Sequence, residues 1–596
     1  MDQHVFENPP RLDPAASPVP AQPLVFGGLA GFYHPAGGRT AVLLLSPWGY
    51  EELCSRKSYR MLGEKLSAAG FPCLRFDYPA TGHSAGSAPD LDDNGAWRTA
   101  VKAAFAELKR LSGLEHVIVA GQGIGAALAA DLAQSEELAG LVVLAPVLQG
   151  RAYLRELAAW TAMTQPTFLV KASDGPDGGL MAGGFVLSRA TAEEFKSLNL
   201  LKASAPRTEH LLLVDRPDHP GDQKLAEHYA AEGVAPERMA FEGYLDYVAD
   251  PTLSVAPEAT LDRIVDWVKG KFPQEVESAP AVPEGLSPDF TPVAGVKEEL
   301  VRFGPDDMFF GVFAQPESGS PRSAVLILNS GYDHSIGWAR MAVGFARQLA
   351  ANGSAVLRVD LAGIGESRYW PGQPGQVLYS DRQVDDVSAA IDWLTERLGV
   401  TRVILSGRCS GAYLALLAAA RDERVNGAFL INPRRLVWDP DEDVDQAIRE
   451  PIQTLETYSR KMFDRETARR VLSGEINPVS AARKVATALS RKADMLFAPV
   501  LRPLSKHHRL SSVLGKRLAA LNERGVPVQL VYSEGDRGLG ELGLWFGQDR
   551  KGLSKYSNVT VGFIADADHN LTPLKARAEA QELLLEFAGV GAGDTA

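Results

Sequence analysis

The chain has 596 residues, of which 45% are hydrophobic and 23% are charged, and three residues are cysteines. This composition excludes a collagen, a coiled coil and a wholly disordered chain, and three cysteines are too few for a disulfide scaffold. The formal net charge of −13 argues against bulk electrostatic binding to nucleic acid or anionic lipid.

The start of the sequence does not resemble a targeting segment. Residues 1–20 are rich in proline and lack the basic and apolar regions of a signal peptide, so we expect a mobile arm. No apolar run approaches the ~18 residues that span a bilayer. We therefore expect a cytoplasmic protein without a membrane span.

Short strand-like and helix-like segments alternate along the chain, in two similar sets. The strand-containing segments are residues 41–50, 71–84, 116–130 and 140–147, then 324–333, 354–367, 402–420 and 427–433. Residues 57–70 and 338–353 have helical periodicity and end at glycine, and residues 23–35 and 298–316 each predict an antiparallel hairpin. The alternation predicts α/β architecture with doubly wound, mostly parallel sheets.

The two sets repeat at nearly constant spacing. Asp77 matches Asp360, Gly123 matches Cys409 and Pro146 matches Pro433, at offsets of 283, 286 and 287. We therefore expect a duplicated domain, with the same fold present twice in tandem.

The predicted boundaries follow from this duplication. A first domain covers residues 21–271, a proline-rich linker residues 272–295, and a second domain residues 296–590. Residues 434–524 form an insertion with a helical pattern, which predicts a cap. Residues 449–524 carry 16 Lys and Arg against 7 Asp and Glu, so this part of the cap is basic. This charge is typical of either a solvated helical surface or an anion-binding lid.

A nucleophile elbow is predicted in the second domain. Residues 402–417 have the form strand, G-x-Nu-x-G, helix, with Gly407, Cys409 and Gly411 at the three fixed positions. Glycine is needed there because the nucleophile sits on a sharp, strained turn. The helix N-terminus that follows favours a thiolate. Cys409 is therefore the predicted nucleophile, and Ser410, one position late, is rejected for that role.

The partners of the nucleophile are expected later in the chain, in the order acid and then histidine. Asp536 and His569 each follow a predicted strand, where side chains project above the edge of a parallel sheet. Three other carboxylates are rival acids: Glu534, Asp566 and Asp568.

An oxyanion hole requires two backbone N–H donors. We expect them from Ser410, directly after the nucleophile, and from Tyr332, in the turn after residues 324–329. His334 lies beside this turn, where a structural or substrate-contacting role is favoured over that of general base.

The first domain lacks the nucleophile and the histidine that are predicted in the second domain. Its elbow reads Gly121-Gln122-Gly123-Ile124-Gly125, with glycine at the nucleophile position. Asp218 remains as an acid, but residues 238–251 contain no histidine, and His228 lies earlier, in a helical stretch. We expect a non-catalytic pseudo-enzyme domain.

Both halves resemble the α/β-hydrolase superfamily. The resemblance rests on the stretch D-x-x-G-x-G-x-S at Asp360–Ser367, the elbow at Gly407–Gly411, and a degenerate D-x-x-x-x-G-x-S at Asp77–Ser84. The second half is also similar to the type 1 hydrolases associated with exosortase A and exopolysaccharide gene clusters, which have cysteine at the elbow and an L-x-N-P strand end. The first half, at residues 46–61 and 243–257, resembles their companion hydrolase. The resemblance implies a fused pair and identifies no substrate.

These observations predict acyl transfer through a thioester on Cys409. His569 takes the thiol proton, and Asp536 orients His569 and stabilises its charged form. The expected substrates are esters or thioesters, either free or bound to CoA or to an acidic acyl-carrier protein that suits the basic segment. A non-catalytic binding or scaffold protein and a lactone hydrolase of the dienelactone type are the alternatives. No metal or dinucleotide motif is present, so no cofactor is predicted, and the oligomeric state stays open.

Overall fold

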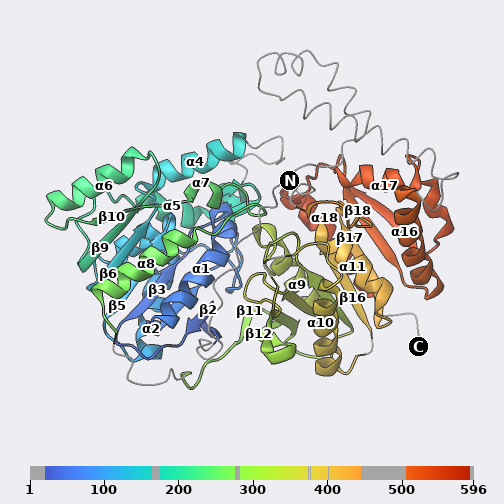
Figure 1. Ribbon diagram of the computed structural model, residues 1–596, viewed down its shortest axis with the longest axis horizontal. Helices are drawn as coiled ribbons and strands as arrows, with labels where there is room; N and C mark the ends of the chain where they lie inside the picture. The colour runs from blue at the N-terminus through green and yellow to red at the C-terminus, as the bar shows by residue number, and fades with distance from the viewer. Residues whose placement is uncertain are drawn as a thin grey trace, which may run out of the picture. The chain divides into compact units, whose positions relative to one another are not determined.

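The computed structural model describes residues 20–163, 175–274, 282–373, 375, 377–400, 402–444 and 505–590. In these residues the chain forms two mostly parallel sheets with helices packed against them (Figure 1). The predicted fold class, two tandem α/β folds, is confirmed. No helix among the described residues is long and apolar enough to cross a membrane.

The first sheet has the strand order β1-β2-β4-β3-β5-β6-β9-β10. Its strands are β1 (Gln22–Phe26), β2 (Leu29–His34), β3 (Ala41–Leu45), β4 (Cys73–Phe76), β5 (Val117–Gln122), β6 (Leu138–Leu144), β9 (Thr208–Asp215) and β10 (Glu237–Ala240). Strands β1 and β2 form the predicted antiparallel hairpin, β2 pairs with β4 antiparallel, and the remaining pairs are parallel.

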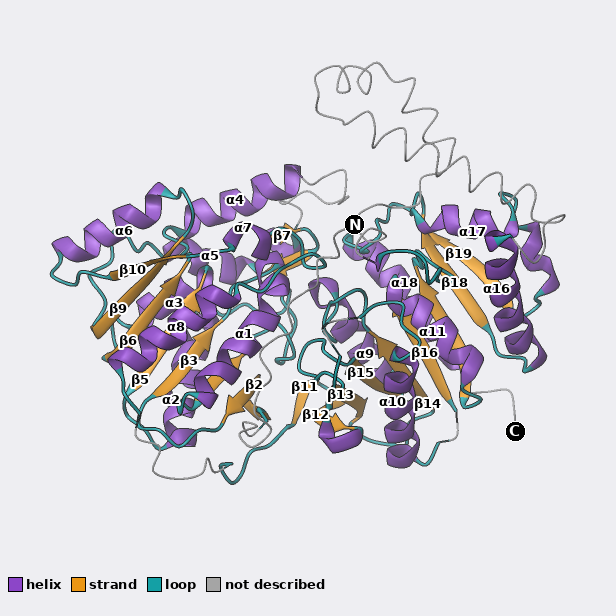
Figure 2. Cartoon of the chain, in the orientation of Figure 1, coloured by secondary structure: helices purple, strands orange, loops and turns teal. Residues whose placement is uncertain are grey.

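Helices cover both faces of this sheet (Figure 2). They are α1 (Tyr50–Ala68), α2 (Ala96–Ser112), α3 (Ile124–Leu132), α4 (Gly150–Met163), α5 (Arg189–Ser197), α6 (Pro220–Ala231), α7 (Tyr244–Tyr247) and α8 (Glu258–Lys271). A small separate hairpin, β7 (Leu180–Ala182) with β8 (Phe185–Leu187), was not expected from the sequence.

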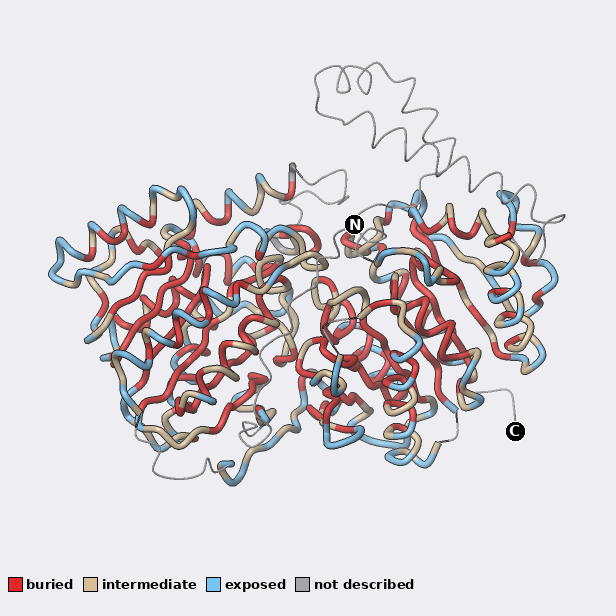
Figure 3. The backbone as a smooth tube through the Cα atoms, in the orientation of Figure 1, coloured by how far each residue is buried: buried red, intermediate tan, exposed pale blue. Residues whose placement is uncertain are grey.

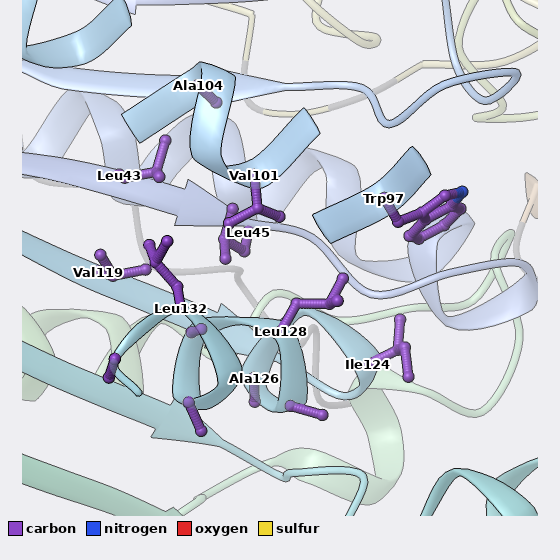
Figure 4. Packing of buried hydrophobic residues seen from close by; sticks show 14 of the residues in the cluster. Leu43, Leu45, Trp97, Val101, Ala104, Val119, Ile124, Ala126, Leu128 and Leu132 are labelled. Carbon is purple, nitrogen blue, oxygen red and sulfur yellow. The ribbon is translucent and has the colours of Figure 1, made fainter. Parts of the chain in front are cut away.

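The side-chain alternation of a strand explains why both faces are apolar. Leu43 and Leu45 of β3 pack with Val101 of α2 and Leu128 of α3 in one buried cluster (Figure 4). Val42 and Leu44 of the same strand belong to a second cluster, which includes residues of α1 and α8. Figure 3 shows these central strands as buried throughout.

The second sheet contains the strands of the second fold. One run has the order β11-β12-β13-β15-β14: β11 (Asp289–Val293), β12 (Val296–Phe303), β13 (Phe309–Pro316), β15 (Ser354–Asp360) and β14 (Ser323–Leu328). The other run is β16 (Val403–Arg408), β17 (Val425–Ile431), β18 (Val528–Ser533) and β19 (Val559–Ile564), all parallel. Strands β12 and β13 form the second predicted hairpin.

The helices of the second fold are α9 (Met341–Ala351), α10 (Gln383–Leu398), α11 (Ser410–Arg421), α16 (Lys506–Glu523), α17 (Gly538–Phe546) and α18 (Leu574–Val590). Most of the predicted cap lies outside the described residues, as do residues 1–19 of the arm and 275–281 of the linker. The end of the cap range forms α16, and Arg524 after it donates to the carbonyl of Ala419 in α11 at 2.8 Å. The end of the linker range forms strand β11.

The repeated landmarks adopt the same local structure in both folds. The hydroxyl of Ser84 donates to the backbone carbonyl of Asp77 at 2.6 Å, and that of Ser367 donates to the carbonyl of Asp360 at 2.5 Å. The chain therefore repeats a turn geometry as well as a sequence pattern.

The chain divides into two compact units, Met1–Gln376 with Asn570–Gln581, and Val377–His569 with Glu582–Ala596. The division lies inside the predicted second domain, and the domain boundaries stay predictions. Buried ion pairs explain why β12, β13 and β15 belong to the same unit as the first fold. Arg75 of β4 donates to Glu366 in the loop after β15 at 2.8 Å, and Arg347, which pairs with Glu298 of β12, also donates to the carbonyl of His83 at 3.0 Å.

Candidate active site

Cys409 occupies a strained turn between β16 and α11. Its backbone has φ 55° and ψ −115°, a conformation that residues other than glycine rarely adopt. A Cβ on Gly407 would lie 2.4 Å from the backbone of Gly411, so the turn requires glycine at position 407. The amide of Cys409 donates to the carbonyl of Ile431 at 2.9 Å, which fixes the turn against β17.

His569 and Asp536 lie in the loops after β19 and β18. His569 donates from Nδ1 to Oδ2 of Asp536 at 2.7 Å, and the carboxylate is 1% exposed whereas the imidazole is 19% exposed. The other carboxylate oxygen accepts the amide of Gly538 at 2.7 Å. Because Nδ1 is occupied, the imidazole meets Cys409 through Nε2, and a side-chain hydrogen bond joins these two residues.

The loop that carries His569 is held by a network of hydrogen bonds. Asn432 donates to the carbonyl of His569 at 3.1 Å and to the hydroxyl of Ser533 at 2.9 Å. Ser533 donates to the carbonyl of Asp568 at 2.8 Å, and Arg408 donates to the carbonyl of His569 at 3.4 Å. These bonds hold the backbone of the His569 loop from the ends of three neighbouring strands, which limits the positions that the imidazole can take.

The electrostatics of the group favour a charged pair. Burial raises the pKa of the Cys409 thiol, but the positive charge and hydrogen bond of His569, with Arg434 and Arg408, outweigh burial and lower this pKa to about 6. Burial lowers the pKa of His569, but the Cys409 thiolate and the bond to Asp536 raise it above its ordinary value. The lowered pKa of Cys409 and the raised pKa of His569 together favour a thiolate beside an imidazolium.

The rival carboxylates are placed differently from Asp536. Glu534 and Asp566 have exposed side chains, and the backbone carbonyl of Asp568 accepts the Ser533 hydroxyl. Among the described residues, Asp536 is the carboxylate whose hydrogen bond to His569 is observed.

The two predicted oxyanion donors lie on different elements. Ser410 is the first residue of α11, directly after Cys409. Tyr332 lies in the turn after β14, where Asn329 donates to the carbonyl of Asp333 at 2.9 Å and the amide of Asp333 donates to the carbonyl of Ser330 at 3.0 Å. The role of both amides stays a prediction. His334 is buried, and its Nε2 lies 4.0 Å from Oε2 of Glu52.

The first fold has the same elbow without a nucleophile. Gly123 has φ 59° and ψ −120°, close to the values at Cys409. A Cβ on Gly123 would lie 2.8 Å from Oε2 of Glu51, whose other oxygen accepts the Gln122 amide at 2.8 Å. The Glu51 carboxylate therefore occupies space that a nucleophile would need.

The predicted acid and the histidine of the first fold are not assembled into a site. Asp218 is exposed, with φ 53°, in the loop after β9. His228 lies in α6, and its Nε2 is 2.8 Å from the carbonyl of Ala203.

Two arginines beside the nucleophile were missed by the sequence reasoning. Arg408 precedes Cys409 and contacts the His569 loop, and Arg434 follows β17. A comparison of the duplicated turns would have signalled Arg434, because the first half has Val147 at the matching position, 287 residues earlier.

Comparison with known proteins gives a sequence family and distant structural likenesses. The family described as "Serine aminopeptidase, S33" matches residues 39–180 and 319–540, which is more than half of the chain. No curated protein matches. An α/β serine hydrolase homologue from Coxiella burnetii is 14% identical over 48% of this chain and 95% of that chain, with a TM-score of 0.28. A dienelactone hydrolase from Anabaena variabilis is 14% identical over 49% and 97%, with a TM-score of 0.29.

Proposed function

The chain belongs to the family described as serine aminopeptidase, S33, and we propose that its second α/β-hydrolase fold breaks ester or thioester bonds with Cys409 as nucleophile. The proposal is supported by the hydrogen-bonded series Cys409, His569 and Asp536, in which Cys409 lies on a strained elbow. These are the three roles that nucleophilic acyl transfer requires: a nucleophile, a base and a group that orients the base.

The first half-reaction forms a thioester. The Cys409 thiolate attacks the carbonyl carbon of the donor, and the carbonyl electron pair moves to oxygen. We assign stabilisation of this oxyanion to the N–H groups of Ser410 and Tyr332. The electron pair then returns and expels the alkoxide or thiolate, which takes the proton from Nε2 of the His569 imidazolium.

The second half-reaction releases the acyl group. Water, an alcohol or an amine gives its proton to the neutral His569 as it attacks the thioester carbonyl, and the Cys409 thiolate leaves. Asp536 keeps Nδ1 of His569 protonated throughout and stabilises the charge that the imidazole gains. Hydrolysis and acyl transfer differ only in the acceptor.

A cysteine nucleophile favours thioester donors. Exchange between two thioesters is nearly balanced in free energy, so the acyl-enzyme stays reactive towards an acceptor. We therefore propose thioesterase or acyltransferase chemistry on a small acyl ester or thioester, with CoA and acyl-carrier thioesters as the donors to test. A dienelactone-type lactone hydrolase would use the same three residues.

We further propose that the first fold is non-catalytic. Position 123 is glycine and therefore has no nucleophilic side chain, and the Glu51 carboxylate lies where such a side chain would be. This fold keeps its buried core and has lost the nucleophile at its elbow, and both features are compatible with a binding role.

Turnover of short acyl-thioesters and activated esters tests the proposal, with Cys409→Ala as the test variant. Cys54→Ala is a matched control, because burial raises the pKa of the Cys54 thiol and makes it unreactive. We expect loss of turnover in Cys409→Ala only. Turnover that persists in Cys409→Ala would contradict the proposal and favour a non-catalytic second fold or another nucleophile.

A further inference from the structure

Arg434 occupies a turn that is structurally duplicated. In the first fold the amide of Gly123 donates to the carbonyl of Leu144 at 3.1 Å, and in the second the amide of Cys409 donates to Ile431 at 2.9 Å. The next residue has positive φ in both turns: 42° at Ala145 and 46° at Asn432. The elbow and the turn beside it are therefore joined by the same backbone hydrogen bond and have the same backbone conformation in the two folds.

This relation places residue 434 beside the nucleophile. In the first fold the amide of Val147 donates to the carbonyl of Gly123, the elbow residue, at 2.9 Å. Arg434 is the counterpart of Val147, as Cys409 is the counterpart of Gly123. At this turn position the fold with a nucleophile has an arginine, and the other fold has a buried valine.

The charge of Arg434 reaches the site residues directly. Beside the larger effect of burial, it acts to lower the pKa values of Cys409, His569 and Asp536. A guanidinium that influences all three groups lies close to the place where a substrate carbonyl would meet the thiolate.

The guanidinium of Arg434 forms no ion pair with a carboxylate in the described part of the chain. The residue is half-buried, and its Nε is buried without a hydrogen-bond partner among the described residues. The adjacent Arg435 differs, because its Nη2 lies 3.3 Å from a carboxylate oxygen of Glu442. A half-buried guanidinium that no carboxylate pairs with can bind a further anion, and its planar shape suits the two oxygens of a carboxylate or phosphate.

We propose that Arg434 binds an anionic group of the substrate, a carboxylate or a phosphate, next to the bond that Cys409 attacks. The inference rests on the proposed function and adds a substrate class to it: acyl donors or acceptors that carry a negative charge close to the reacting carbonyl. Arg434 is the first residue of the predicted cap range and lies outside its basic segment, residues 449–524, so this site is distinct from recognition of a carrier protein by the basic segment.

The test compares two alkylating reagents of similar size, the anion iodoacetate and the neutral iodoacetamide. Their second-order rate constants with Cys409 are measured in the full-length protein. The pH is well above the Cys409 pKa of each variant, so that Cys409 is fully deprotonated in every variant. We expect Arg434→Gln to lower the iodoacetate-to-iodoacetamide rate ratio by about tenfold or more. Arg434→Lys keeps the positive charge but loses the two parallel N–H donors of the guanidinium, so we expect an intermediate rate ratio.

Arg537→Gln is the matched control. Arg537 is exposed, and its substitution removes the same unit of positive charge at the residue next to Asp536. An unchanged ratio in Arg434→Gln, or an equal fall in Arg537→Gln, would overturn the inference and leave the proposed function intact. No modification of Cys409 by either reagent in the wild type would instead overturn the proposed function. Protection of Cys409 from iodoacetamide by acetate or by inorganic phosphate, lost in Arg434→Gln, distinguishes the two anions.

Discussion

Replacement of Asp536 by asparagine removes the charge that orients His569 while it keeps the shape of the side chain. The bond from Nδ1 of His569 to Asp536 is 2.7 Å long, and the carboxylate is 1% exposed, so the bond is charge-assisted and shielded from water. Hydrogen bonds of this kind contribute about 1.5–3 kcal/mol. At 1.36 kcal/mol for each factor of ten, the acylation rate should fall ~10–150-fold.

The same substitution should change the pH dependence of alkylation. Loss of the carboxylate lowers the pKa of His569, so less imidazolium is present at a given pH. Because the imidazolium is what brings the pKa of Cys409 down to about 6, the midpoint of the iodoacetamide rate profile should move to higher pH. The assay combines single-turnover acylation with this profile.

Glu534→Gln is the matched control, since Glu534 is an exposed carboxylate in the same loop. It should leave both the acylation rate and the midpoint unchanged. An Asp536→Asn variant that acylates within about twofold of the wild type and keeps its midpoint would refute the assigned role, because the bond would then contribute less than about 0.5 kcal/mol.

Three further predictions concern stability and the elbow turns. Gly407→Ala places a Cβ 2.4 Å from facing backbone and should cost about 1–3 kcal/mol of unfolding free energy, seen in urea denaturation, together with loss of acylation. Glu366→Gln leaves the buried Arg75 without its partner and should cost ~3–5 kcal/mol. Because Arg75 outweighs burial and holds the pKa of Glu366 below its usual value, this difference from the wild type should be present at neutral pH and diminish as pH falls below ~4, where the unfolded carboxyl is protonated. Gly123→Cys should give no acyl adduct on the first fold in mass spectrometry, since the half-buried Glu51 carboxylate lies 2.8 Å from the new Cβ and no histidine follows β10 in the described loop.

The sequence contains enough information to predict the two folds and the elbow. Strand alternation and the repeated landmarks depend on local patterns, and the glycines around Cys409 are required by a turn of a few residues. The turn at Gly123 could be recognised for the same reason, because it keeps the glycines and lacks the nucleophile.

Other features depend on contacts that no local pattern contains. The carboxylate of Asp536 bonds to His569, whereas Asp568 bonds to Ser533 through its backbone carbonyl, and both contacts depend on how two separate loops are placed. The pair of Arg75 and Glu366 joins residues 291 positions apart, and this distance makes it invisible in the sequence. The sequence pattern predicts a linker where strand β11 forms, because the proline and the short length of this strand are typical of an unstructured segment.

Intact-protein mass spectrometry after incubation with acyl-thioesters and activated esters, followed by peptide mapping, tests the central claim most directly. The account predicts a mass increase of one acyl group in the wild type, mapped to the peptide that contains Cys409. It predicts the absence of this adduct in Cys409→Ala and its retention in Cys54→Ala. An adduct at another residue, or none in the wild type while Cys409 also resists iodoacetamide, would contradict acyl transfer by this site.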